Sequence, residues 1–335
     1  MKVLLAIDCL PCSHPELAMV VSRGWPPGTI IRFVTAINRT ESISEFFVKD
    51  PSDSWAAEQE RVVQARRALA AAIGGATARL LPAVLLEEHV LLGHVKEELL
   101  RFAEDWRADL IVIGANAKVR PGLPFLGNVA QSVLQHSYCP VHIARLKNAD
   151  VAPEHQPPIS NILVAVDHSP HSNATVDWVL RQGWIPPYRV KLLTALPEVA
   201  EQISKEKNAE KASKLVKEQQ ELKSRVDERL KACALGMEAR MGAGLVEYES
   251  IEGPPADVIL QAAHDWPADL IVIGSHGRSA ITRFLLGTVS QSVAINAPCP
   301  VEVIKLNSYP IQEKPHEEIH QRTDEDQDRM PHVMM

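Results

Sequence analysis

The sequence has few cysteines, no long apolar run and no segment that resembles a signal peptide. Only 5 of its 335 residues are cysteine, too few for a disulfide framework in a chain of this length, which favours a reducing compartment. No apolar run approaches the roughly 20 residues of a membrane-spanning helix. The first residues read as a strand and lack the apolar core and cleavage site of a signal peptide. We therefore expect a cytoplasmic protein with no membrane partner.

An excess of positive charge is also absent, since 42 acidic residues outnumber 35 lysines and arginines. The formal net charge is -7, so we expect no nucleic-acid partner, because nucleic-acid-binding surfaces are usually basic. The Gly-x-x-x-x-Gly-Lys-Ser/Thr loop of P-loop proteins is absent from the sequence. No histidine spacing typical of zinc sites and no Ser-His-Asp order stands out, so we assign no metal ligands and no catalytic residues.

The chain instead contains one unit written twice. Residues 2–8 return at 161–167, and residues 105–114 return at 265–274, each about 160 residues later. The motif Cys139-Pro-Val likewise returns at Cys299. A period of this length is that of a whole domain rather than of a short solenoid repeat.

The repeat predicts the domain organisation. We expect domains over 1–147 and 159–306, a polar, proline-rich linker over 148–158 and a disordered, charged tail over 307–335.

Strand-like and helix-like segments alternate within each unit, which predicts α/β domains with helices on both faces of a parallel sheet. The expected strands are 2–8, 30–37, 84–90, 109–114 and 140–146, then 161–167, 189–195, 245–251, 269–274 and 300–306. The expected helices are 14–23, 54–73, 94–106 and 128–137, then 172–182, 200–234, 254–266 and 288–296.

The second unit places a glycine-containing turn between a buried strand and a helix start. The strand ends at Gly274, Gly277 follows in the turn, and Gly287 precedes the helix. Backbone N–H groups at a helix start attract phosphate, and glycines leave room for a ligand to approach the main chain. Ligands of parallel sheets bind beyond the carboxyl ends of the strands. We therefore expect Asp167, at the end of its own strand, to converge with this loop.

In their order and spacing, these motifs resemble the universal stress protein family. The resemblance rests on Asp167, on the run from Asp269 to Arg278, on Gly287-Thr288 and on Cys299-Pro-Val. It covers nearly the whole of each repeat. It implies a tandem universal stress protein with two five-stranded, Rossmann-like sandwich domains. It also implies an intramolecular pseudo-dimer with residues 141–144 and 301–304 at the seam, and it leaves a further homodimer open.

The resemblance further implies that the protein binds ATP, with Mg²⁺ as an optional companion of the nucleotide, in stress response or regulation. Hydrolysis would be slow at most, and the protein partner is undefined. Asp167 would meet the ribose or the adenine edge, and Ala195 would line the adenine pocket. Arg278 or Arg283 would add positive charge near the phosphates. The implied contacts are Ala165, Val166, Asp167, Ala195, Ile273, Gly274, His276, Gly277, Arg278, Gly287, Thr288, Val289 and Ser290.

The first half departs from this pattern in its glycine loop. Ala117 stands in place of the second glycine, and Asn128 stands in place of Thr288. If Ala117 must adopt a positive φ, its Cβ costs roughly 1 kcal/mol or more and obstructs the phosphates. We therefore expect the first site, which retains Asp8, to be weak or empty.

Two other functions stay open. Cys9 and Cys12 form a Cys-x-x-Cys pair at a strand-to-helix turn, which would suit a thiol-redox or adenylate-transferring enzyme. A zinc site shared with His168 and His171 is a minor variant of this idea. The alternative is a nucleotide-independent scaffold, in which the charged helix over 198–235 recruits a partner, although such a charge run more often forms a solvated face.

Two recurring positions are interpreted as packing positions. Cys139 and Cys299 share one slot before a proline, and we expect both to be buried. Trp106 and Trp266 recur at a helix end, where we expect core packing.

Overall fold

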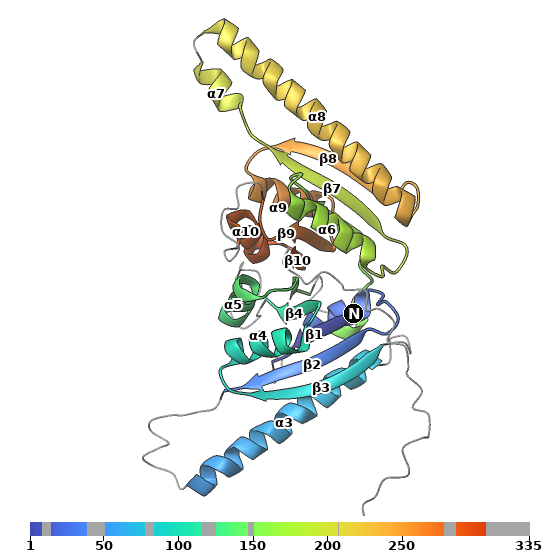
Figure 1. The fold of residues 1–335 in the computed structure, drawn as a ribbon, viewed down its shortest axis with the longest axis vertical. Coiled ribbons are helices and arrows are strands. Elements are labelled where there is room, and N and C mark those ends of the chain that lie inside the picture. The colour runs from blue at the N-terminus through green and yellow to red at the C-terminus, as the bar shows by residue number, and fades with distance from the viewer. Residues whose placement is uncertain are drawn as a thin grey trace, which may run out of the picture.

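The computed structural model of the chain is a single long sheet with helices on both faces (Figure 1). It describes residues 1–8, 15–38, 51–77, 84–115, 125–146, 151–206, 208–277 and 286–305. The Cys9/Cys12 pair, Ala117, Arg278, Arg283 and the tail expected over 307–335 lie outside these residues, so the predictions made for them stay predictions.

The first half contains β1 (Lys2–Ala6), α1 (Pro15–Ser22), β2 (Ile30–Ile37), α3 (Pro51–Thr77), β3 (Leu85–Leu92), α4 (Val95–Trp106), β4 (Leu110–Gly114), α5 (Asn128–His136) and β5 (Val141–Ala144). A short 3₁₀ turn, η1 (Pro153–His155), follows. The second half contains β6 (Asn161–Ala165), α6 (Pro170–Arg181), β7 (Arg189–Leu196), α7 (Ala200–Lys205), α8 (Ala209–Met241), β8 (Val246–Glu252), α9 (Pro255–Asp265), β9 (Leu270–Gly274), α10 (Thr288–Asn296) and β10 (Val301–Ile304).

The strand order is β3-β2-β1-β4-β5-β10-β9-β6-β7-β8. Within each half the strands are parallel, which confirms the predicted α/β class. In the second half the strand order reverses between β6 and β9. The chain continues from β6 to β7 on one side of this point and from β9 to β10 on the other. Ligand crevices of such sheets form at a reversal of this kind.

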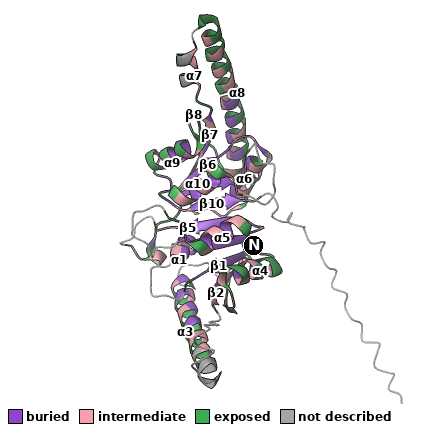
Figure 2. Ribbon diagram, turned by 90° about the vertical axis from the view of Figure 1, so that its left-hand side faces the viewer, coloured by how far each residue is buried: buried purple, intermediate pink, exposed green. Residues whose placement is uncertain are grey.

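One predicted helix is wrong in its extent. The segment expected as a single helix over 200–234 forms α7 and then α8, which continues to Met241. The side chain of Asn208 separates them, because its Oδ1 accepts hydrogen bonds from the N–H groups of Glu210 (2.9 Å) and Lys211 (3.2 Å) and so starts a new helix. Figure 2 shows the far end of α8 as mostly exposed, in keeping with its charged sequence.

The cores on the two faces of the sheet are organised differently. On one face, α4 and α5 share a single apolar cluster with α9 and α10 of the second half. On the other face, each half has a cluster of its own, under α1 and α3 in the first half and under α6 and α8 in the second. The halves are therefore joined by a continuous core on one face only.

The seam between the halves is the pair β5 and β10, which run antiparallel and confirm the expected pairing of the last strands. His142 lies opposite Glu302 in this register, and the two are equivalent positions of the repeat. A second contact joins Gly24 to Gly183. A Cβ built on Gly24 would lie 2.8 Å from the carbonyl oxygen of Gly183, so only glycine allows the two backbones to approach this closely.

Two cations, one from each half, cap the carboxyl-terminal end of a helix in the other half. The guanidinium of Arg145 donates to the carbonyls of Ala294 and Ile295, at the end of α10 in the other half. In the second half, Lys305 Nζ donates a hydrogen bond to the carbonyl oxygen of Leu134 in α5, 2.8 Å away. Cations at helix carboxyl ends are favourable because the last carbonyls lack helical partners. Each half thus completes the last helix of the other.

A group of buried polar side chains occupies the centre of the seam. Arg23 Nη1 lies 3.2 Å from Glu302 Oε2, and both side chains are 0% exposed. Trp178 also donates to this carboxylate from Nε1. Burial raises the pKa of Glu302, but the charge of Arg23 and the hydrogen bond from His142 outweigh burial and lower the pKa to about 2. The carboxylate is therefore ionised inside the protein.

Cys139 and Cys299 are both buried, as predicted. Trp106 and Trp266 pack against the core at its margin and are only partly buried, so the expectation of core packing holds in part. Among the described residues, no helix combines the length and the apolar character needed to cross a membrane.

Candidate functional site

The loop after β6 holds Asp167 in a fixed position at the start of α6. Ser169 caps this helix by accepting a hydrogen bond from the N–H of Ser172. The Oδ1 atom of Asp167 accepts from the N–H of Ser169 (3.0 Å) and from the hydroxyl of Ser172. One carboxylate oxygen is therefore engaged by its own loop, and this contact fixes the direction of the other.

The loop after β9 approaches Asp167 from the neighbouring strand. A Cβ built on Gly277 would lie 2.8 Å from Asp167 Oδ2, and one built on Gly274 would lie 3.1 Å from the Cβ of His171. The φ of Gly277 lies outside the left-handed region, so the constraint on a side chain there is steric, and the Asp167 carboxylate would have to shift to admit one. The φ cost expected for its counterpart Ala117 stays a prediction, because Ala117 lies outside the described residues. The structure brings Asp167 and both glycines together, as expected.

Helix α10 begins directly above this loop. Gly287 is its N-cap and donates from its N–H to the carbonyl oxygen of Ser275 at 2.8 Å. The N–H of Gln291 donates to the carbonyl oxygen of Gly287, 2.9 Å away. The N–H groups of Thr288, Val289 and Ser290 precede that bond, so they have no acceptor within the helix. They are the groups that an anion at this helix start would meet.

The hydroxyl of Ser290 joins the start of α10 to the end of β9. Its side chain is buried, and its Oγ donates to the carbonyl oxygen of Gly274 at 2.6 Å. The nucleotide contact implied for Ser290 stays a prediction, and the backbone N–H is the group that could make it. Thr288, in contrast, is exposed at the helix entrance.

Two histidines line the same crevice. The rings of His171 and His276 lie 5.3 Å apart, and His276 Nδ1 is 3.0 Å from the hydroxyl of Ser275. The other ring nitrogen of His276 is buried and has no hydrogen-bond partner among the described residues. Burial, followed by the proximity of His276, lowers the pKa of His171, while Asp167 opposes this change. The sequence signalled His171 only as a zinc ligand, and no group of three or more metal-binding side chains occurs in the described part of the chain.

The remaining strand residues form the floor of the crevice. Ala165, Val166 and Ile273 are buried at the ends of adjacent strands, and Ala195 is partly buried on β7. Val166 is held in place because its N–H donates to the carbonyl oxygen of Leu193 at 2.9 Å. The crevice thus combines an apolar floor, one carboxylate, two close glycines and N–H groups that have no acceptor within α10.

The matching region of the first half is filled by Glu16, which the sequence did not single out. Its carboxylate lies against Gly114, at the end of β4, and the residue is 7% exposed. Burial raises the pKa of Glu16 to about 7, and nearby Asp8 adds to the increase. Its Oε2 atom is buried with no hydrogen-bond partner among the described residues. An acid at this position takes up space and opposes an anionic ligand.

In its described residues, the first half also lacks a side-chain hydrogen bond between α5 and β4 like the one that Ser290 makes between α10 and β9. Gly127 caps α5 and donates to the carbonyl oxygen of Ala115 at 3.0 Å, as Gly287 does to Ser275. Ala130, however, occupies the position that corresponds to Ser290 and has no hydroxyl to offer Gly114. The two crevices therefore share a backbone plan but differ in the side chains that shape them.

The model of the Universal stress protein family matches residues 1–145 and 158–305. A universal stress protein of Methanocaldococcus jannaschii is 45% identical over 60 residues, which cover 18% of this chain and 35% of that protein. One from Thermus aquaticus is 47% identical over 55 residues, covering 16% of this chain and 40% of that protein. The matched segments thus span less than half the length of these curated relatives.

Solved structures show the same fold over most of the chain. A universal stress protein from Archaeoglobus fulgidus aligns with 91% of this chain and 96% of its own, with a TM-score of 0.55 at 19% identity. A putative universal stress protein from Pseudomonas aeruginosa aligns with 91% of this chain and 92% of its own, with a TM-score of 0.53 at 13% identity.

Proposed function

The chain belongs to the universal stress protein family, and from that premise we propose that its second half binds ATP as a regulatory ligand in a stress response. The observation that carries the proposal is the contact between Asp167 and Gly277. With a Cβ position only 2.8 Å from Asp167 Oδ2, the glycine loop lies against the carboxylate with no side chain between them. A ribose and its phosphates can therefore lie along the backbone at the point where the strand order reverses.

The phosphates would extend toward the start of α10. The N–H groups of Thr288, Val289 and Ser290, which have no acceptor within α10, are donors there, and the positive end of the helix favours negative charge. The tie from Ser290 to Gly274 supports this assignment, because it holds the donors in place before the ligand arrives. Fixed donors bind an anion more tightly than donors that must first be ordered.

The base and the ribose would lie over the apolar floor. Val166 and Ile273 are buried beneath the crevice, and Ala195 stands beside them on β7. Asp167 would accept a hydrogen bond from the ribose or the adenine edge. Arg278, outside the described residues, stays a predicted source of positive charge.

The first half would stay empty under the same proposal. Glu16 lies against Gly114, at the end of the strand that corresponds to β9. A carboxylate there repels phosphate when it is ionised and occupies space when it is protonated. We therefore assign one nucleotide to each chain.

ATP would act on conformation or partner choice rather than as a fuel. The sequence has no identified catalytic base and no arginine finger, so hydrolysis would be slow at most. Mg²⁺ would arrive with the nucleotide. The cytoplasmic location, the protein partner and a further homodimer stay predictions.

The test is a calorimetric titration of the full-length chain with MgATP. Gly277→Val places a branched side chain against Asp167, so we expect at least a tenfold loss of affinity. Gly236→Val is the matched control, because a Cβ at Gly236 meets nothing within 4 Å, and its affinity should equal that of the wild type. Equal binding by Gly277→Val would overturn the proposal. A wild-type protein that neither binds millimolar ATP nor is thermally stabilised by it would favour the scaffold alternative.

A further inference from the structure

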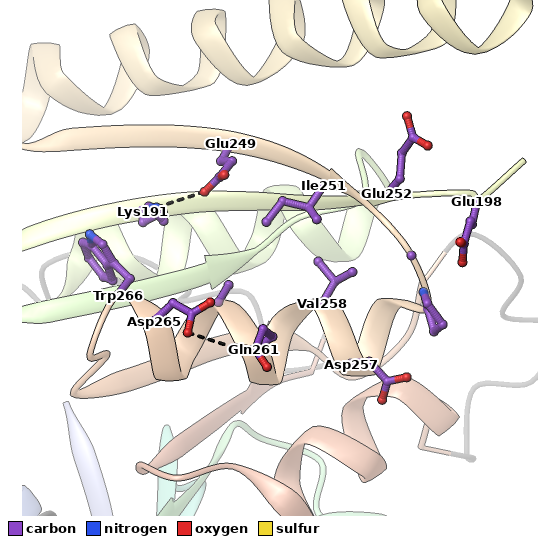
Figure 3. Close-up of a pocket in the computed structure, with 13 residues that line it drawn as sticks. Lys191, Glu198, Glu249, Ile251, Glu252, Asp257, Val258, Gln261, Asp265 and Trp266 are labelled. Atoms are coloured by element: carbon purple, nitrogen blue, oxygen red, sulfur yellow. Dashed lines mark hydrogen bonds and ion pairs between the residues drawn. The ribbon is translucent and has the colours of Figure 1, made fainter. Parts of the chain in front are cut away.

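A groove of about 560 Å³ lies between α9 and the strands β7 and β8 (Figure 3). Ile251 and Val258 form its apolar middle, and Trp266 closes one end. The lining contains five carboxylates, which are those of Glu198, Glu249, Glu252, Asp257 and Asp265. Lys191 is the cation of this lining, and its Nζ pairs with Glu249 at 3.0 Å. The groove is therefore apolar in its middle and strongly negative at its rim.

The first half fills the same place with its own side chains. Phe102 occupies the repeat position of Ala262, and His89 occupies that of Glu249. The rings of Phe102 and His89 lie 5.0 Å apart over the corresponding strands. The groove is open in the second half because an alanine and a glutamate replace two rings.

The first half also indicates which chemical group this architecture holds. The guanidinium carbon of Arg32 lies 4.1 Å from the ring centre of Trp106, and its Nε is 2.5 Å from Glu87 Oε2. Trp106 is the counterpart of Trp266. A guanidinium stacked on an indole and paired with a carboxylate is a favourable arrangement.

The second half supplies no cation at that close distance from within the described chain. Arg189 and Lys191 both lie 5.7 Å from the ring centre of Trp266, and each is already paired, with Glu247 and Glu249 respectively. The indole therefore has charges at its margin, while the adjoining groove is lined with acid.

We propose that this groove binds an arginine-containing, basic segment of a partner protein. One arginine would stack at the Trp266 end, next to Asp265, with its stem along Ile251. A second basic side chain would reach Glu252 and Asp257 at the other end. The charge complementarity argues for this occupant, because the opposite charge gives the segment both its orientation and a salt-dependent attraction.

The dimensions of the groove set the spacing of the two basic residues. Asp257 and Asp265 are eight positions apart on α9, which is about 12 Å at 1.5 Å per residue. An extended chain covers about 13 Å in four residues at roughly 3.3 Å each. The segment would therefore carry basic residues at positions i and i+4, which also point to the same side of an extended chain.

The probe is the peptide acetyl-Arg-Ala-Ala-Ala-Arg-amide, titrated by calorimetry into the full-length chain at low salt. Its matched control replaces both arginines with citrulline, which keeps the shape and removes the charge. We expect the arginine peptide to bind at least tenfold more tightly than the citrulline peptide, and its affinity to fall as salt is added.

Two variants test the position of the site. Ala262→Phe copies the first half and should weaken binding of the arginine peptide at least tenfold. Because Ala262 is buried, the exposed double variant Glu252→Gln/Asp257→Asn provides a test that does not disturb the core, with an expected loss of at least fivefold. Glu97→Gln, at the first-half counterpart of Asp257, should leave the affinity unchanged. Absence of arginine-peptide binding, equal binding of the citrulline peptide, or affinities unchanged in both groove variants would each overturn the proposal.

Discussion

Glu302 faces His142 at the centre of the antiparallel seam, with Glu302 Oε2 3.3 Å from His142 Nδ1. These are equivalent positions of the repeat, 160 residues apart, yet one carries an acid and the other a base. Arg23 adds a positive charge from the first half, and its own counterpart, Gln182, is neutral and accepts a hydrogen bond from Arg23 at 2.7 Å. The buried charges are therefore complementary because the acid comes from the second half and the arginine from the first.

Glu302→Gln should strongly destabilise the protein. The change leaves the guanidinium of Arg23 buried without a countercharge, and breaking a buried pair on one side typically costs about 3–5 kcal/mol. The measurement is the free energy of unfolding in urea. Glu247→Gln is the control, because its pair with Arg189 is on the surface and should contribute under about 1 kcal/mol. Similar losses in the free energy of unfolding would show that the buried pair contributes no more than the surface pair.

Acid should weaken the wild-type protein through the same carboxylate. The pKa of Glu302 is lowered from 4.5 to about 2 in the folded chain. A lowered carboxyl pKa stabilises the folded state above the unfolded pKa, and this stabilisation is lost as the pH falls from about 4.5 towards 2. The loss amounts to about 3 kcal/mol. Urea unfolding of wild type and Glu302→Gln from pH 6 to pH 2.5 should show a steeper decline for the wild type, and parallel curves would contradict the assignment.

Glu16→Gln should have the opposite dependence on pH. The pKa of Glu16 is raised from 4.5 to about 7, so the folded state retains a proton that the unfolded state has released. The contribution of Glu16 to stability is then greatest below pH 4.5 and declines as the pH rises through 7. Glutamine cannot ionise, so the variant should gain up to about 3 kcal/mol over the wild type at pH 8 and little at pH 4.5. Unfolding free energies at these two pH values decide the matter, and a variant less stable than the wild type at pH 8 would refute the prediction.

Ser290→Ala should affect both stability and nucleotide binding. Losing the 2.6 Å hydrogen bond to the carbonyl of Gly274 leaves a buried acceptor unpaired, which costs about 1–3 kcal/mol. Because α10 would no longer be tied to β9, the affinity for ATP should also fall, by about three- to tenfold. Urea unfolding and calorimetry measure the two effects. The reverse change in the first half, Ala130→Ser, should not create ATP binding, because Glu16 still fills that crevice.

Sequence signals sufficed for much of the fold and for the convergence of Asp167 with the glycine loop. The repeated apolar runs predicted β4 and β9, and the pairing of β5 with β10 followed from the family resemblance. The convergence of Asp167 with Gly277 followed from the rule that parallel strands present their carboxyl ends at one edge. These features depend on residues near in sequence or on a general property of parallel sheets.

Features that arise from packing between distant residues could not be predicted. Arg23 and Glu302 are 279 residues apart, and nothing near either of them signals a buried pair. Glu16 looks like an ordinary acid in the first turn of a helix, where acids are favoured, and its burial follows from the space above Gly114. The groove beside α9 depends on the exchange of Phe102 for Ala262, whose effect appears only when the helix is packed on the sheet.

The charges at the seam also restrict which partner each half can pair with through its last strand. Two copies of the second half, paired through β10, would bring two Glu302 carboxylates together with no arginine between them. Two copies of the first half would enclose Arg23 with no acid. Neither half could therefore pair with a second copy of itself through its last strand without burying an uncompensated charge, and each half is a suitable mate only for the other.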